Sequence, residues 1–187
     1  YGMVDLPSGK MKSREGTVVD ADELMADVIH GAKEMTKERG HLDDMSEDAK
    51  EELYHQIGMS GLKYYLLKVD PKKRMMFNPQ ESIDLNGNTG PFIQYTYARI
   101  CSLLEKAGSY ENRLNTSMSI IKSEKDVIKA ISRFPSIIDE SAKSFTPSDI
   151  TSYCYELVKL YNQFYQSVKI LPETDLDIRS NRLLLSS

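Results

Sequence analysis

The sequence is poor in the residues that build metal centres and disulfide frameworks. Its 187 residues include only two cysteines and three histidines. Cys101 and Cys154 stand alone, without a CxxC pair, and the histidines are scattered at positions 30, 41 and 55. Zinc and similar metals need several such ligands close together, so no metal site is expected. Isolated cysteines fit a protein of the reducing cytoplasm, and we expect a cytoplasmic location.

Long apolar runs and an excess of positive charge are also missing. No stretch of eighteen apolar residues occurs, so no membrane span and no membrane partner are expected. Lys and Arg number 24 against 28 Asp and Glu, a formal net charge of −4. A protein that coats nucleic acid through charge alone is therefore excluded, and any contact with nucleic acid must be local.

A short loop near the start concentrates glycine and positive charge. Residues 9–16 read GKMKSREG, ahead of an expected helix. Glycines let a backbone approach an anion and the cationic side chains neutralise its charge, so the loop has the composition of a polyphosphate clamp. On the pattern alone, a solvated surface loop is the better-supported interpretation.

Helical signals dominate the remaining sequence, and the fold class is predicted to be mainly α. Acidic residues at 20–23 begin one helix, and Ser46 caps the start of a second. Gly58 and Gly61 are expected to interrupt this second helix before an apolar run resumes. Turn residues are densest at 69–90, where we place a hinge and the domain boundary.

The next predicted helix begins at Pro91 and ends before Gly108. Its core face is predicted to carry Ile93, Tyr97, Ile100, Leu104 and Ala107. A second face carries Phe92, Tyr95, Arg99 and Leu103. Tyr95 and Arg99 are four residues apart, so their side chains lie side by side, and a ring next to a guanidinium suits a splayed RNA base. The pattern alone favours the alternative, in which this face packs on another helix and Arg99 pairs with an acid.

Further helices are predicted toward the C-terminal end. Ser123, with Asp126 three residues on, is expected to cap one of them. The buried edge of that helix is predicted to comprise Val127, Ile128, Ile131 and Phe134. Pro147 begins a long helix with an aromatic core face, which we expect to end at Pro172. Tyr153 lies at the edge of this face, where its hydroxyl is expected to reach solvent or ligand.

Three stretches together resemble the arginyl-tRNA synthetase family. Residues 1–19, YGMVDLPSGKMKSREGTVV, resemble the segment that carries this family's version of the class I KMSKS loop. Residues 63–79, KYYLLKVDPKKRMMFNP, look like the segment that joins the catalytic and anticodon-binding domains. Residues 87–99, GNTGPFIQYTYAR, are similar to the family's GNTGP-x-x-QY-x-x-AR signature. The pattern of the DALR-type anticodon-binding domain is followed at Phe134, Pro135, Pro147, Tyr153, Leu157, Phe164 and Tyr165.

The resemblance implies a fold and a reaction. Residues 1–80 would form the helical end of the catalytic domain, and residues 81–187 a helical bundle of the class I synthetase anticodon-binding type. The family activates arginine with ATP and Mg²⁺ and transfers it to tRNA(Arg), so ATP, arginine and tRNA(Arg) are the implied ligands. Lys10 would be catalytic, stabilising charge that develops on the phosphates. The ATP-binding loop would comprise Lys10, Met11, Lys12, Ser13 and Arg14.

The sequence departs from the family pattern in two respects. Lys12 stands where KMSKS has its serine and Ser13 where it has its second lysine, which leaves the roles of Lys12 and Arg14 open. A HIGH-type motif and the first half of a nucleotide-binding fold are missing. We therefore expect a monomeric C-terminal fragment, with an incomplete helix at 175–187, that does not aminoacylate on its own.

For tRNA and anticodon binding, the residues implied by the resemblance are Asn88, Phe92, Tyr95, Arg99 and Tyr153. Two alternatives remain open. One is another class I synthetase with a DALR-type bundle, such as a cysteinyl enzyme, against which the signature at 88–91 speaks. The other is a helical protein-interaction domain without an RNA role, which the composition alone would accept.

Overall fold

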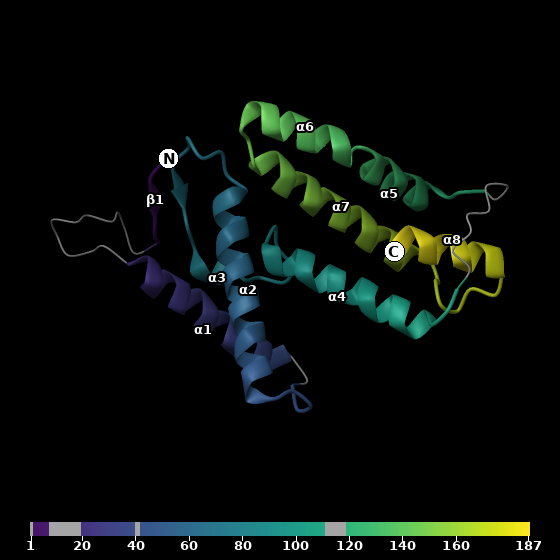
Figure 1. Ribbon diagram of the computed structural model, residues 1–187, viewed down its shortest axis with the longest axis horizontal. Coiled ribbons are helices and arrows are strands. Elements are labelled where there is room, and N and C mark those ends of the chain that lie inside the picture. Colours follow the sequence, from purple (N-terminus) through teal and green to yellow (C-terminus); the bar gives the residue numbers. More distant parts are fainter. Residues whose placement is uncertain (1, 8–19, 40–41, 111–118) are drawn as a thin grey trace.

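The computed structural model describes residues 2–7, 20–39, 42–110 and 119–187, and these are mainly helical, as predicted (Figure 1). Two short strands, β1 (Val4–Asp5) and β2 (Met75–Met76), pair in parallel with Val4 opposite Met75. The helices are α1 (Ala21–Arg39), α2 (Glu47–Leu67), α3 (Pro79–Ser82), α4 (Gly90–Ala107), α5 (Lys122–Ser132), α6 (Phe134–Ser144), α7 (Ser148–Ser167) and α8 (Leu176–Ser186). None of the helices in the described ranges has the length and apolar character that a membrane crossing requires.

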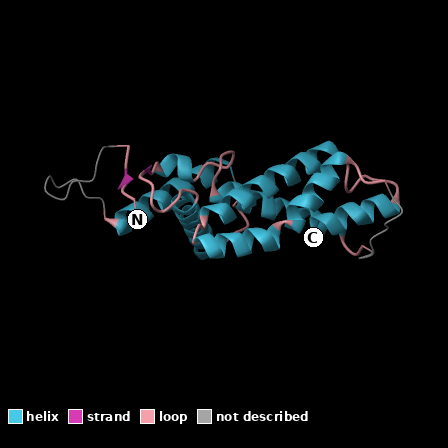
Figure 2. Ribbon diagram, turned by 90° about the horizontal axis from the view of Figure 1, so that it is seen from above, coloured by secondary structure: helices cyan, strands magenta, loops and turns pink. Residues whose placement is uncertain are grey.

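The N-terminal elements share one hydrophobic core. α1 packs along α2, and α3 and the strand pair close the same cluster, whose buried members are Leu6, Val28, Leu62, Phe77 and Ile83. Arg74 fastens the strand pair from outside, because its guanidinium donates to both carboxylate oxygens of Asp5, one of them at 2.9 Å. This core lies at one end of the elongated molecule (Figure 2).

A second core lies at the other end, between α4, α5, α7 and α8. Its buried members are Leu103, Val127, Tyr161, Phe164, Ile170 and Leu183. Arg182 of α8 holds the edge of this core, with hydrogen bonds to Glu124 of α5 at 2.9 Å and to Glu173 at 2.8 Å. The tail helix, which was expected to be incomplete, forms as α8 and packs on this core through Leu183, which is fully buried.

The α4 boundaries agree with the prediction. The Thr89 hydroxyl accepts the Phe92 N–H at 3.2 Å, which satisfies one of the free donors at the helix start, and Pro91 needs no partner for its nitrogen. Gly108 follows the last helical residue. Ser46 likewise caps α2, as expected, by accepting the Ala49 N–H at 3.3 Å.

Other helix signals were misinterpreted. α2 runs through Gly58 and Gly61 without a break, because both glycines serve close packing. A Cβ at Gly58 would lie 2.8 Å from the backbone of Ile29, so the missing side chain lets α1 and α2 approach. Ser123 lies inside α5, and the start of that helix is capped by Glu124, which accepts the Ile121 N–H at 3.0 Å.

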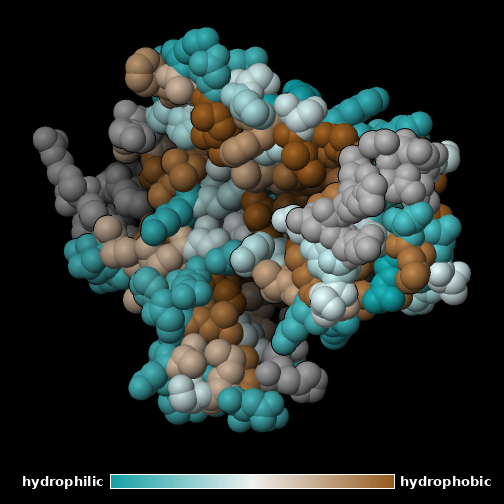
Figure 3. Space-filling model, turned by 45° about the vertical axis from the view of Figure 1, so that its right-hand side comes forward, coloured by the Kyte–Doolittle hydropathy of each residue, from teal (hydrophilic) through white to brown (hydrophobic). Residues whose placement is uncertain are grey.

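The end of α7 and the expected apolar edge of α5 also differ from the prediction. α7 ends at Ser167 rather than at Pro172. Of the four residues predicted for this edge only Val127 is buried, whereas Ile128, Ile131 and Phe134 are exposed, because α7 covers one side of these helices alone. Figure 3 shows hydrophobic surface along the upper part of the molecule, at the level where Figure 1 places α5 and α6.

The two cores are joined where α2, α4 and α7 meet. The buried hydroxyl of Tyr64 lies 2.6 Å from the side-chain oxygen of Asn88 and 2.9 Å from the carbonyl oxygen of Thr151. Gly90 contacts Ser60 so closely that a Cβ there would overlap it. These contacts link α2 to the start of α4 and to α7.

Candidate functional site: an aromatic and guanidinium pocket

The side chain of Arg99 lies between two tyrosine rings on the α4–α7 surface. Its guanidinium carbon is 5.0 Å from the ring centre of Tyr95 on α4 and 5.3 Å from that of Tyr165 on α7. Guanidinium groups are attracted to the faces of aromatic rings at this distance. The structure thus brings Tyr95 and Arg99 together as the helical spacing predicts. It adds a second ring, Tyr165, which lies 66 residues after Arg99 in the sequence.

A polar network fixes the direction of the guanidinium. Arg99 donates to the side-chain oxygen of Asn162 on α7. The Asn162 amide in turn donates to the hydroxyl of Thr96 at 2.9 Å and to the carbonyl of Val158 at 3.0 Å. Thr96 is almost fully buried, so this network is anchored in the protein interior. The alternative is half right: this face does pack on another helix, since Leu103 is buried against α7, but the partner of Arg99 is an amide and not an acid.

These side chains border a pocket of about 370 Å³. The residues around it are Tyr95, Ala98, Arg99, Ser102, Leu103, Lys106, Tyr165 and Leu171. Tyr95 is half exposed, so one face of its ring is available to a ligand. The pocket combines flat aromatic surface with two cations, Arg99 and Lys106, which suits a planar group attached to an anion.

Phe92 and Asn88 lie outside this pocket, toward the junction with α2. The Phe92 ring packs against Tyr155 of α7, with ring centres 5.8 Å apart. The side-chain oxygen of Asn88 faces the Tyr64 hydroxyl, and its backbone carbonyl accepts from Lys68 at 3.2 Å. Burial lowers the pKa of Lys68. The role of Phe92 and Asn88 in tRNA binding stays a prediction, and the structure gives both residues contacts within the fold.

Tyr153 lies on the opposite side of α7. Its hydroxyl donates to the carbonyl of Ala130 at 3.1 Å, and its ring stacks on Phe134 with centres 5.4 Å apart. Burial is the main cause that raises the pKa of Tyr153. The hydroxyl that was expected to reach solvent or ligand therefore ties α7 to α5. The role of Tyr153 in tRNA binding stays a prediction.

The predicted ATP-binding loop, Lys10, Met11, Lys12, Ser13 and Arg14, lies outside the described residues, and so does its predicted catalytic Lys10. Within the described part of the chain, no three His, Cys, Asp or Glu side chains converge in a way that could hold a metal ion.

Sequence reasoning missed Tyr165 and Lys106, which border the pocket, and Asn162, which orients Arg99. Tyr165 was assigned to the aromatic core face of its helix, and Asn162 was not singled out. Both lie on α7, at positions three residues apart, so the pair shares a face. The signal that could have found them is a polar residue one turn from an aromatic residue on an otherwise apolar helix face.

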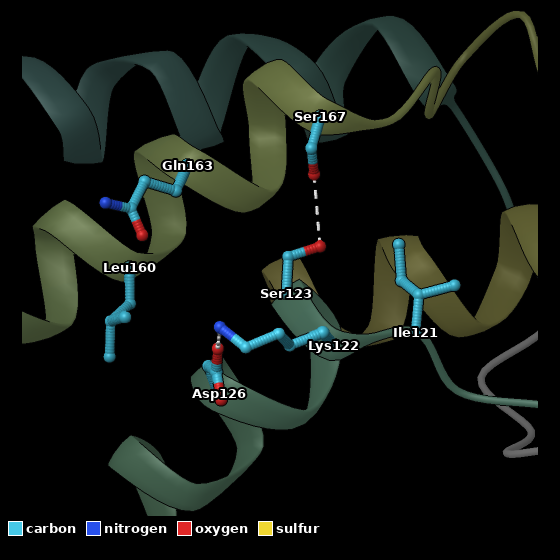
Figure 4. A pocket seen from close by; sticks show the side chains of 7 residues that line it. All are labelled: Ile121, Lys122, Ser123, Asp126, Leu160, Gln163 and Ser167. Carbon is cyan, nitrogen blue, oxygen red and sulfur yellow. Dashed lines mark hydrogen bonds and ion pairs between the residues drawn. The ribbon is translucent and has the colours of Figure 1, made fainter.

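A second depression, of about 360 Å³, lies between α5 and α7 (Figure 4). Most of its polar side chains are already paired with each other, and only Gln163 lacks a partner among the described residues. The hydroxyls of Ser123 and Ser167 are 3.0 Å apart, and Lys122 forms an ion pair with Asp126 at 3.3 Å. With these groups engaged on each other, the depression offers a ligand less than the Arg99 pocket does.

Comparison with known proteins identifies the family to which this part of the chain belongs. The DALR anticodon binding domain matches residues 93–187, which is half of the chain and includes most of α4, all of α7 and the pocket between them. The chain belongs to the DALR anticodon-binding domain family. The match to the DALR domain begins at Ile93, three residues after the start of α4, and extends to the last residue.

Longer proteins match this DALR-family chain over its whole length. It is 54% identical to an arginine–tRNA ligase of Flavobacterium psychrophilum and 50% identical to one of Parabacteroides distasonis, in each case over 100% of the chain. It covers 31% and 32% of those proteins, so it spans about a third of the length of the relatives that it matches.

Solved structures agree with the fold. Thermus thermophilus arginyl-tRNA synthetase superposes with a TM-score of 0.88 at 25% identity, covering all of this chain and 31% of that one. The arginyl-tRNA synthetase of Plasmodium falciparum shares the fold, with a TM-score of 0.76 at 21% identity. These matches favour neither a cysteinyl enzyme nor a helical protein-interaction domain.

Proposed function

We propose that this chain contains the anticodon-binding part of an arginine–tRNA ligase and binds tRNA(Arg). The observation that carries the proposal is the Arg99 guanidinium held between Tyr95 and Tyr165, on a chain of the DALR family. The relatives that match it throughout are named arginine–tRNA ligases. We further propose that residues 81–187 form the anticodon-binding domain and residues 1–80 the end of the catalytic domain.

Base recognition follows from the chemistry of the pocket. An unpaired base stacks on the exposed face of Tyr95, because stacking needs only a flat π surface. Arg99, oriented by Asn162, directs its remaining N–H groups to acceptor atoms on the edge of the base. Lys106 lies at the same pocket and neutralises a backbone phosphate.

The proposed parent enzyme activates arginine with ATP and Mg²⁺ in the cytoplasm, as a monomer. Lys10 and the loop at 10–14 would stabilise the charge that builds on the phosphates as the arginine carboxylate attacks. We expect the 187-residue chain alone to show no arginine-dependent exchange of pyrophosphate into ATP. Measurable exchange by the purified chain would contradict this division of labour.

The proposal is tested by titrating the chain with tRNA(Arg) and with a tRNA of another anticodon. Wild type is expected to prefer tRNA(Arg). Tyr95→Ala should weaken binding by about 1–3 kcal/mol, the usual worth of one base stacked on an aromatic ring. Tyr97→Ala is the matched control, because Tyr97 lies on the same helix and is 69% exposed but does not border the pocket.

Arg99→Lys should also weaken binding, since lysine keeps the charge but loses the planar group. Far-ultraviolet circular dichroism and melting curves establish that each variant folds. Equal affinity of wild type and Tyr95→Ala for tRNA(Arg), with both folded, would refute the assignment of the pocket.

A further inference from the structure

Phe145 is exposed in a way that packing does not explain. It follows the last residue of α6 and adopts a left-handed backbone, with φ 55° and ψ 41°. Its own N–H and that of Thr146 both donate to the carbonyl of Ser141, which closes the helix end. Glycine is the residue that this position usually takes, because a side chain makes the left-handed conformation costly. Yet Phe145 carries a large ring that is 87% exposed.

The ring stands at the edge of a pocket of about 560 Å³ between the N-terminal elements and the corner that joins α6 to α7. The pocket is bordered by the strand pair, the C-terminal end of α2, the turn after it, and the corner between α6 and α7. Its surface is mainly apolar and includes Val4, Leu66, Leu67 and Pro147. Leu66 and Leu67 are themselves exposed, so the apolar surface is open to a partner.

Positive charge borders this apolar surface from two separate segments. Lys63 of α2 and Lys73 of the turn before β2 both line the pocket. Neither lysine forms an ion pair with any described residue, although the chain as a whole is negatively charged. The one acid of the pocket, Asp70, accepts the backbone N–H of Lys72 at 2.8 Å.

We propose that this pocket is a second RNA-binding site, in which an unpaired base stacks on Phe145 and the adjoining phosphates contact Lys63 and Lys73. An exposed ring flanked by lysines is the combination that binds single-stranded nucleic acid. The free cations favour RNA over an apolar protein segment, which would leave them without anions. This inference rests on the proposed function, and it adds to it a contact on tRNA remote from the Arg99 pocket.

The sequence contains no tryptophan, which permits a direct test. Phe145→Trp introduces a single indole, and stacking of a base on it is expected to quench its fluorescence when tRNA is added to the 187-residue chain. Binding of tRNA without quenching overturns the proposal. A spectral shift that depends on protein concentration without RNA would identify a second copy of the chain as the occupant and overturns it as well.

Affinity measurements supply the second test. Phe145→Gly should weaken tRNA binding about 5-fold or more, while the melting temperature stays equal or rises, because glycine suits the left-handed backbone. Lys63→Gln and Lys73→Gln should each lower the dependence of log K on log salt by about 0.7. Lys125→Gln, at an exposed lysine of α5 away from both pockets, serves as the control.

The outcomes separate the two proposals. If Tyr95→Ala weakens tRNA binding and the variants at Phe145, Lys63 and Lys73 do not, the second site is wrong and the Arg99 pocket stands. If wild type binds no tRNA, both proposals fail.

Discussion

Replacing Tyr64 by phenylalanine should loosen the junction between the two cores. The Tyr64 hydroxyl is buried and faces two acceptors, the Asn88 side chain and the Thr151 carbonyl. Asn88 is exposed, so water replaces its lost partner, but Thr151 is buried and its carbonyl would lose its side-chain partner. A hydrogen bond is worth about 1 kcal/mol net, and a buried group left unpaired costs about 1–3 kcal/mol. We expect Tyr64→Phe to lower the free energy of unfolding by about 1–2 kcal/mol.

Urea unfolding at pH 7 measures this change, and Tyr65→Phe is the matched control. Tyr65 is the next residue, and its hydroxyl makes a long contact of 3.4 Å to an exposed carboxylate, so its loss should cost under about 0.5 kcal/mol. Equal stability of Tyr64→Phe and wild type would refute the junction argument.

Tyr64 should also make the stability of the wild-type chain fall at alkaline pH. Burial raises the pKa of Tyr64 well above the ordinary value near 10. At a pH between the unfolded and the folded pKa, the folded chain retains the Tyr64 proton that the unfolded chain has lost. The contribution of Tyr64 to the free energy of unfolding is therefore complete below about pH 10 and declines as the pH rises further. Between about pH 9 and pH 11, one unit on either side of the ordinary tyrosine pKa, the free energy of unfolding should therefore fall less for Tyr64→Phe than for wild type. An equally steep loss in the variant would contradict the assignment to Tyr64.

Two further substitutions test the packing. Arg182→Met should lower the free energy of unfolding in urea by about 2–4 kcal/mol, because it leaves the nearly buried carboxylate of Glu124 without its cation. A change below about 1 kcal/mol, the value of an exposed ion pair, would mean that the pair is solvated. Gly58→Ala should lower the free energy of unfolding by about 1–3 kcal/mol, although alanine has the better helix propensity, because the new Cβ would lie 2.8 Å from Ile29. Gly87→Ala is the control, since the atom nearest to its new Cβ is at 3.4 Å. Equal stability of the two variants would refute the close-packing argument.

Local signals predicted the helices well where the deciding interaction lies within one turn. Ser46 caps α2, and Pro91 and Gly108 delimit α4, because caps, proline and glycine act through neighbouring backbone groups. The same rules misled at Gly58, where glycine is needed because the backbone of Ile29, 29 residues earlier in the sequence, packs against it. Close approach between distant segments leaves no trace in the local pattern.

Burial was predicted less well, because periodicity identifies an apolar face and says nothing of what covers it. Val127 and Ile131 belong to one predicted edge, yet α7 covers only the first. Tyr97 was assigned to the core face of α4 together with Ile100, and is 69% exposed. A helix with neighbours on one side buries only part of its apolar face, and the positions of the neighbours are set by the whole fold.

The Arg99 pocket shows the same boundary between local and global information. Tyr95 and Arg99 could be paired from their spacing because both lie on α4. Tyr161 and Tyr165 are one turn apart on α7 and indistinguishable by pattern, yet the first is buried in the core and the second faces Arg99. Which ring becomes part of the pocket depends on how α7 crosses α4, and that crossing is fixed in part by Asn162, which bonds both Thr96 and Arg99 of the facing helix. A polar residue in an aromatic helix face is therefore the better indicator of a binding surface than the aromatic residues around it, since an amide there needs partners that only another helix can supply.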